Sequence, residues 1–238
     1  MEGVGDTLGY IRDFYFDDHE WVIRYIVADT HRWLPGRDVL VSPQHAGEAD
    51  WASRTLKTNL TGEQMKQSPG VEEDLPVSKQ EKLDISNVTL WAPLWYPLGT
   101  PLVGMPVTVS AEVEGDNEQE EPCENTWDPR LRSVREVIGY AVSTPQDRIA
   151  TIRDFILETE GWLLRYLVAD TGGWLSGKRV LIAPLWVERV DWANAEIHTD
   201  LPTDMIKEAP PFDPQEAVNR EYEERLYDYY GRPAYWKE

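Results

Sequence analysis

The chain is poor in the features that would mark a secreted or membrane-spanning protein. Its single cysteine, Cys123, cannot form an internal disulfide. No apolar run approaches the roughly 18 residues of a transmembrane helix, and the first residues lack the basic and apolar regions of a signal peptide. These absences predict a cytoplasmic protein without a membrane span.

Basic residues are also scarce. The chain has 23 Lys and Arg against 43 Asp and Glu, which gives a formal net charge of −20. Such a surface repels the phosphates of nucleic acids and anionic lipids, and it attracts basic proteins. We therefore expect no nucleic-acid ligand and a protein partner of basic character. The 41% hydrophobic content with 11 tryptophans excludes a chain that is disordered throughout.

A long internal repeat organises the sequence. Trp21–Thr30 recurs as Trp162–Thr171, and the same shift of 141 residues holds without a gap from Ile11 to Pro69. The recurring signature residues are Asp13, Trp21, Arg24, Trp33 and Gly36 in the first copy, and Asp154, Trp162, Arg165, Trp174 and Gly177 in the second. A period this long predicts two units, each with a core of its own.

Each copy begins with a predicted β-hairpin. In the first copy β-branched and aromatic residues dominate the two arms, Ile11–Phe16 and Trp21–Asp29. A four-residue turn between the arms would place Asp13 opposite Arg24, and Asp154 opposite Arg165 in the second copy. Such cross-strand ion pairs are worth about 0.2 to 1 kcal/mol, and we interpret them as structural rather than catalytic.

Further short strands follow in both copies. Proline ends the predicted strands Val39–Pro43 and Val180–Pro184 because it cannot donate to a ladder. A hairpin is predicted next, most clearly over Val187–Trp192 and Glu196–Leu201, and then a short helix with a Thr-x-x-Gln capping box at Thr61. The pattern predicts a mainly β protein with two small barrels in tandem, short helices, and irregular connections rich in aromatic residues and proline.

The stretches Ile11–Phe14, Trp21–Thr30, Trp33–Arg37 and Val39–Pro43, with their second copies over Ile152–Pro184, resemble the PRC-barrel domain. This is the small barrel of the photosynthetic reaction-centre H subunit and of a ribosome maturation factor. About half of the positions from Ile11 to Pro43 are identical in the two copies, and the resemblance covers about two-thirds of the chain.

The resemblance implies a non-catalytic interaction or assembly module with no shared active site. It also carries an alternative, a peripheral component of a photosynthetic reaction-centre or light-harvesting membrane complex. The chain departs from the family examples in two respects. It lacks the membrane helix of the H subunit and the separate N-terminal domain of the maturation factor.

We expect a first unit over residues 1–85, a connection over 86–130, a second unit over 131–211 and a C-terminal helix with an aromatic tail over 212–238. The second copy is preceded by Val134–Val142, a predicted first strand. The shift places the equivalent of Val142 at residue 1, so the first barrel should be open. We expect its edge to be filled by part of Val88–Val109, by the other unit, or by a second chain that makes a homo-oligomer; the alternative is a truncated or misassigned start.

Two aromatic segments lie outside the repeat. Trp91, Trp95 and Tyr96 belong to an apolar stretch that either packs over a barrel face or binds a partner. An acidic run over 111–128 follows and is typical of a linker. The tail is predicted to form a helix over Pro214–Tyr230, and its aromatic stripe, with Trp236 beyond it, either belongs to the core or contacts a partner. The tail residues that would contact a partner are Tyr229, Tyr230 and Trp236.

Patterns typical of catalysis are absent. The four histidines have no metal-ligand spacing and none recurs between the copies. No phosphate-binding loop, dinucleotide-binding glycine pattern or nucleophile elbow is present. We therefore predict no catalytic, cofactor or metal site. A hydrolase that uses acidic residues is the remaining enzyme hypothesis, and a pocket with convergent carboxylates would favour it.

Overall fold

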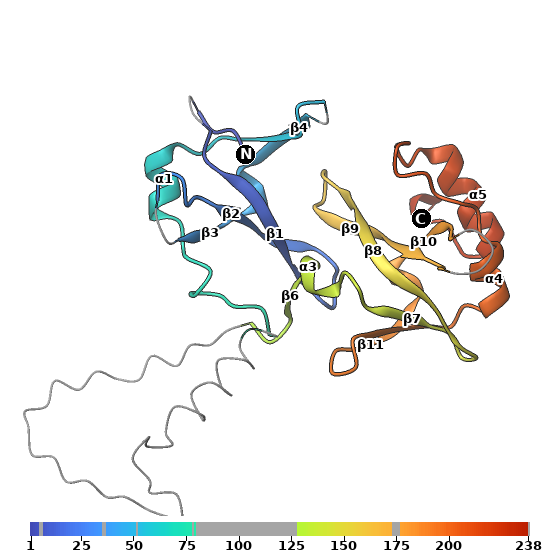
Figure 1. Cartoon of the computed structure of the whole chain (residues 1–238). Coiled ribbons are helices and arrows are strands. Elements are labelled where there is room, and N and C mark those ends of the chain that lie inside the picture. The colour runs from blue at the N-terminus through green and yellow to red at the C-terminus, as the bar shows by residue number, and fades with distance from the viewer. Residues whose placement is uncertain are drawn as a thin grey trace, which may run out of the picture.

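The computed structural model describes residues 1–4, 7–34, 37–50, 52–77, 79, 128–172 and 177–237. A first four-stranded sheet has the order β3-β2-β1-β6, and a hairpin of β4 and β5 lies beside it. A second, six-stranded sheet has the order β10-β9-β8-β7-β12-β11. Four short helices accompany the described sheets, so the mainly β class is confirmed (Figure 1).

The elements of the first part are β1 (Tyr10–Asp17), β2 (Ile23–Asp29), β3 (Asp38–Val41), η1 (Pro43–His45), β4 (Ala46–Asp50), β5 (Thr55–Thr58), α1 (Gly62–Gln67) and β6 (Leu131–Ser133). Those of the second are α3 (Val134–Val137), β7 (Ala141–Ser143), β8 (Arg148–Glu158), β9 (Leu163–Asp170), β10 (Arg179–Ile182), η2 (Pro184–Trp186), β11 (Val187–Asp191), β12 (Glu196–Thr199) and α4 (Thr203–Glu208). The chain ends with α5 (Arg220–Tyr230) and η3 (Tyr235–Lys237).

The structure repeats with the period of the sequence. Strands β1 to β5 and helix α1 correspond to β8 to β12 and α4 after the shift of 141 residues. Even the irregularities recur: both hairpins have two bulges at matching positions. Trp21 and Trp162 have positive φ angles of 58° and 53°, and so do Arg54 and Ala195. We call residues 1–79 the first repeat and residues 134–211 the second repeat.

Local chemistry explains where several elements begin and end. The predicted capping box is confirmed, because the Thr61 hydroxyl accepts from the Gln64 backbone and the Gln64 side chain accepts from the Thr61 backbone. Helix α5 begins at the cap Asn219 and ends at Gly231, whose φ of 61° is left-handed. The helix is shorter than expected, since residues 214–219 are not helical.

The sheet of the second repeat curls around one core without closing. In the described chain no ladder joins its end strands β10 and β11. Instead, Pro184 interrupts the ladder and η2 turns the chain from one strand into the other. The expected barrel is therefore an open, wrapped sheet. Its core includes buried residues of β7, β8, β9, β10 and β12 together with three residues of helix α5.

The start of the first repeat corrects one expectation. Glu2 pairs with Lys57 and with Thr7, as Ser143 pairs with His198 and Arg148 in the second repeat. Met1 is buried in the core of the first repeat at the place equivalent to Val142. Two residues thus complete the ladder at this end of β1, where an open edge was expected.

The other end of β1 is covered by a strand that precedes the second repeat. Strand β6 pairs antiparallel with Tyr15, Phe16 and Asp17 of β1. Of the three expected ways to fill the edge, the structure shows filling by the other unit, because β6 lies within residues 131–211. Val88–Val109 lies outside the described residues.

Two predictions about local structure are wrong. Residues 134–137 form helix α3 instead of a strand, because the Ser133 hydroxyl accepts from the Glu136 backbone and caps the turn. Asp13 lies opposite Val27 rather than Arg24, and Asp154 lies opposite Val168. The bulges in each hairpin shift the register that a regular four-residue turn would give.

The two repeats meet through matching backbone segments. Val22 forms an antiparallel bridge with Leu163, its own counterpart in the other repeat. Two reciprocal hydrogen bonds flank the bridge, from Ile23 N to Trp162 O (2.8 Å) and from Leu164 N to Trp21 O (2.9 Å). Equivalent residues therefore contact each other in both directions, which is the pattern of an isologous two-fold interface formed within one chain. We call this contact the seam.

Candidate interaction site

Each repeat contributes a tryptophan that packs against the core of the other repeat. Trp21 of the first repeat stacks on Phe16 at 5.3 Å between ring centroids, and both join the core of the second repeat. Trp162 of the second repeat packs in return against the core of the first. Both tryptophans have left-handed backbone, and Trp162 packs against the core of its own repeat as well. The signature tryptophans 21 and 162 therefore link the two repeats.

A buried carboxylate holds the turn that presents Trp21. Asp17 is fully buried and accepts hydrogen bonds from the backbone of His19 (2.9 Å) and Glu20 (3.0 Å). Arg24 lies 3.3 Å and Arg130 3.7 Å from its Oδ2 atom. Burial alone would raise the pKa of Asp17, but these hydrogen bonds and arginines outweigh it, so the pKa is lowered.

Beside the turn a groove of about 430 Å³ opens between the repeats. Its walls come from the turn at Asp18–Trp21, from the beginning of β9, and from η2 and β11. Leu185 of η2 projects from this wall and is 76% exposed. The equivalent position in the first repeat is Gln44, which is polar. The second repeat thus presents an apolar side chain where the first does not.

The rim of the groove is charged. Glu20 and Glu188 contribute acidic groups, and Arg165 and Arg189 contribute basic ones. Arg165 is already paired with Glu158. An apolar projection surrounded by charges, beside an end strand of a sheet, is suited to contact with another protein.

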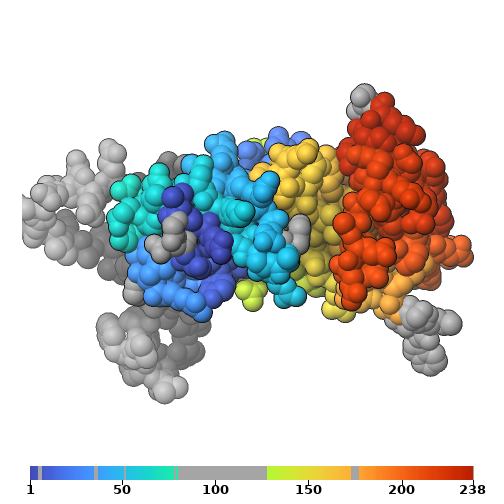
Figure 2. All heavy atoms as spheres, turned by 90° about the horizontal axis from the view of Figure 1, so that it is seen from above, coloured from blue at the N-terminus to red at the C-terminus, as the bar shows by residue number. Residues whose placement is uncertain are grey.

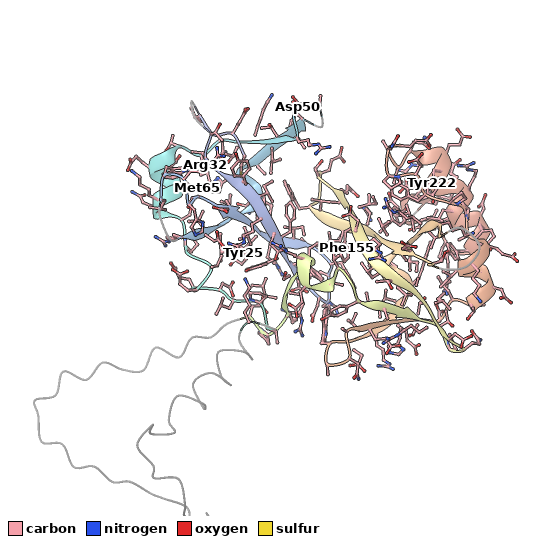
Figure 3. The ribbon with its side chains drawn as sticks, in the orientation of Figure 1. Tyr25, Arg32, Asp50, Met65, Phe155 and Tyr222 are labelled. Carbon is pink, nitrogen blue, oxygen red and sulfur yellow. The ribbon has the colours of Figure 1, made fainter. Side chains whose placement is uncertain are left out.

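The C-terminal helix packs on the second repeat at the end of the molecule away from the first, where Figure 3 labels Tyr222. Glu223 of α5 is buried and accepts hydrogen bonds from Tyr166 (2.8 Å) and Tyr235 (2.9 Å), while Arg220 lies 2.9 Å from its carboxylate. Burial raises the pKa of Tyr166. This network fixes the tail to strand β9.

The structure places the remaining predicted residues in different surroundings. The indole of Trp33 donates to the Leu8 carbonyl at 2.7 Å and packs on the core of the first repeat. Tyr229, Tyr230 and Trp236 pack against the core of the second repeat. Their role as partner contacts stays a prediction. Gly36, Trp91, Trp95, Tyr96 and Trp174 lie outside the described residues.

Asp29, His31 and Asp38 bring their ligand atoms within 4.8 Å of one another. The sequence had shown no metal-ligand spacing for this histidine. The His31 Nδ1 atom lies 2.7 Å from Asp29, and Arg12 lies 2.7 Å from Asp38. Hydrogen bonds from the His31 backbone and ring lower the pKa of Asp29. The residues form an ion-pair cluster of half-buried carboxylates, in which Asp38 Oδ1 is buried without a hydrogen-bond partner among the described residues.

Sequence reasoning missed Asp17, Leu185 and Glu223. The difference between Leu185 and Gln44 in otherwise matching turns was visible in the sequence. The other two owe their importance to burial, which the repeat pattern does not reveal.

One stretch of the chain is similar to known proteins. Residues 129–205 match the model of the PRC-barrel domain. An uncharacterised protein of Deinococcus radiodurans is 36% identical over 76 residues, which are 32% of this chain and 27% of that protein. The match thus spans about a quarter of the relative. Among the residues described, no helix has the length and apolar character to cross a membrane.

Proposed function

We propose, on the premise that residues 129–205 are a PRC-barrel domain, that this protein is a non-catalytic module that binds a protein partner at the groove beside the seam. PRC-barrel domains act in general as interaction or assembly modules. The observation that carries the proposal is the groove of about 430 Å³ with Leu185 76% exposed on its wall.

The sheet contributes to the same surface. Strand β11 is an end strand of the six-stranded sheet, and Val187 to Val190 line the groove. An end strand offers unpaired backbone groups to an extended segment, while a neighbouring apolar side chain supplies contact area. The net charge of −20 favours a basic partner and would speed its approach at low ionic strength.

Photocrosslinking from matched positions of the two repeats tests the proposal. A benzoylphenylalanine is placed at position 185 in one variant and at position 44 in another, in the full chain in its native cells. We expect a defined protein to be crosslinked at position 185 and not at 44. Its affinity for the purified chain should fall with added salt.

Leu185→Gln gives the second repeat the side chain of the first and is the matched functional variant. Because Leu185 is exposed, the substitution should change the free energy of unfolding by less than about 0.5 kcal/mol. We expect it to weaken the crosslinked partner's affinity. The same set of crosslinks at both positions, or an unchanged affinity of Leu185→Gln, would contradict the proposal.

A further inference from the structure

Because the two repeats are related by a two-fold arrangement at the seam, equivalent strand edges in them can be compared directly. Strand β6 covers the edge of β1 at Tyr15–Asp17. The equivalent edge in the second repeat is Ile156–Glu158 of β8, and no strand in the described part of the chain pairs with it on the side away from β9. The two repeats are related by a two-fold arrangement, but among the described residues only the edge of the first repeat has such a strand.

Burial shows the same difference. Tyr15, Phe16 and Asp17 are all 0% exposed under β6, whereas Ile156, Leu157 and Glu158 are partly exposed. In the view from above, β8 and β9 (yellow) reach the surface between the hairpin of β4 and β5 (cyan) and the C-terminal helix (red) (Figure 2). The second edge is therefore accessible where the first is covered.

Asp13, which holds the segment that contains β6, also has an equivalent residue in the second repeat. Asp13 accepts the Ser133 hydroxyl at 2.5 Å and the Arg135 backbone at 3.0 Å. Asp154, its equivalent, is exposed and accepts from the backbone of Phe155, its neighbour, at 2.8 Å. Asp154 thus has the position of an anchor without the segment that Asp13 holds.

The edge of β8 retains the shape that accepts a strand. The bulge between Tyr15 and Phe16 in β1 recurs between Ile156 and Leu157 in β8. Leu157 therefore takes the place of Phe16, the residue that pairs with Arg132 of β6. Equivalent backbone groups face outward on the two strands.

Strand β6 shows what kind of segment fits. Leu131 is fully buried, and the Arg132 guanidinium lies 2.8 Å from Asp18 and stacks over the Trp192 ring at 4.2 Å. Arg130 lies 3.7 Å from Asp17. In the second repeat Glu158 stands at the position of Asp17, and its carboxylate is paired with Arg165 as that of Asp17 is with Arg24.

We infer that the edge of β8 at Ile156–Glu158 binds an extended segment of a partner protein by strand addition, and that the segment alternates basic and apolar residues as β6 does. Asp154 accepts hydrogen bonds from this segment as Asp13 does from residues 133–135. The inference rests on the proposal that the chain binds proteins. It concerns another surface than the groove at Leu185, so the two experiments can fail separately.

A synthetic peptide with the sequence of residues 128–139 is a direct probe, since it contains β6 and α3. Fluorescence anisotropy of the labelled peptide against the full chain should show saturable binding to one site. Asp154→Ala should weaken the affinity about tenfold, because hydrogen bonds to a charged group are lost, without a change in the unfolding midpoint. Methylation of the peptide nitrogen at the position of Arg132 should abolish binding, because it removes a ladder donor.

Binding that Asp154→Ala and the methylated peptide leave unchanged would overturn the inference. Absence of saturable binding would also overturn it. In that case, slow hydrogen exchange at Leu157 and Thr159 in the free protein would show that residues 80–127 or a second copy already cover the edge. Sedimentation would distinguish those two occupants.

Discussion

The substitution Asp13→Ala tests whether the strand before the second repeat is fixed to the first. The Asp13 carboxylate accepts hydrogen bonds from the Ser133 hydroxyl and the Arg135 backbone, which belong to β6 and α3. It also accepts from the backbone of its neighbour Phe14 at 2.8 Å. Removing the carboxylate leaves the first two donors without their partner, and Ser133 is buried.

A hydrogen bond to a charged group contributes about 1.5 to 3 kcal/mol. Because the two bonds share one carboxylate, their contributions do not add fully. We expect Asp13→Ala to lower the free energy of unfolding by about 2 to 4 kcal/mol. Asp154→Ala loses the bond to its own neighbour and no contact to β6, so it should cost less than about 0.5 kcal/mol.

Urea unfolding followed by tryptophan fluorescence gives both values, and the difference between the twin variants isolates the contact with β6. Hydrogen exchange should also become faster over residues 131–137 in Asp13→Ala. Equal destabilisation by the two substitutions would refute the reasoning, because the equivalent aspartates would then have equivalent roles.

Two further predictions concern titratable groups. Because the pKa of Asp17 is lowered by folding, its contribution to stability is present above its unfolded pKa of about 4 and is lost as the pH falls through the lower folded value. Asp17→Asn should thus destabilise the protein by about 1 to 3 kcal/mol at pH 7 and flatten the acid limb of its stability curve; an unchanged limb in urea unfolding would contradict this. The pKa of Tyr166 is raised by burial, then by neighbouring Tyr227 and by Glu223, so its contribution is present below pH 10 and lost only as the pH rises through the folded value. Absorbance at about 295 nm should show that Tyr166→Phe removes a phenol that ionises only when the protein unfolds, and a loss from the ordinary transition near pH 10 would be the contrary result.

The periodicity of the sequence was sufficient to predict much of the fold. The hairpins after each proline and the capping box at Thr61 depend on contacts between residues that are close in sequence. The shift of 141 residues predicted that strands and helices of one repeat recur in the other. The mainly β class followed from the same patterns. What periodicity could not reveal was register, because a bulge adds a residue without leaving a sequence signal. The expected pairing of Asp13 with Arg24 was wrong for this reason.

The candidate interaction surfaces were less predictable. Strand β6 is three residues long and lies in sequence beside the second repeat, yet it pairs with the first. The seam depends on the bridge between Val22 and Leu163. The sequence around these two residues does not indicate that they contact each other. Such long-range contacts arise from packing of whole units. The membrane-complex alternative rests on the resemblance alone and stays a prediction.

The reciprocal seam is the central claim, and a designed disulfide tests it most directly. Val22 and Leu163 form the bridge between the repeats, and a pair of this type places the two Cα atoms about 4.5 Å apart, within the range of a disulfide. In a Cys123→Ser background, Val22→Cys combined with Leu163→Cys should form an intramolecular disulfide in nearly all molecules under mild oxidation, and the product should remain monomeric by mass. Two free thiols under the same conditions would contradict the seam.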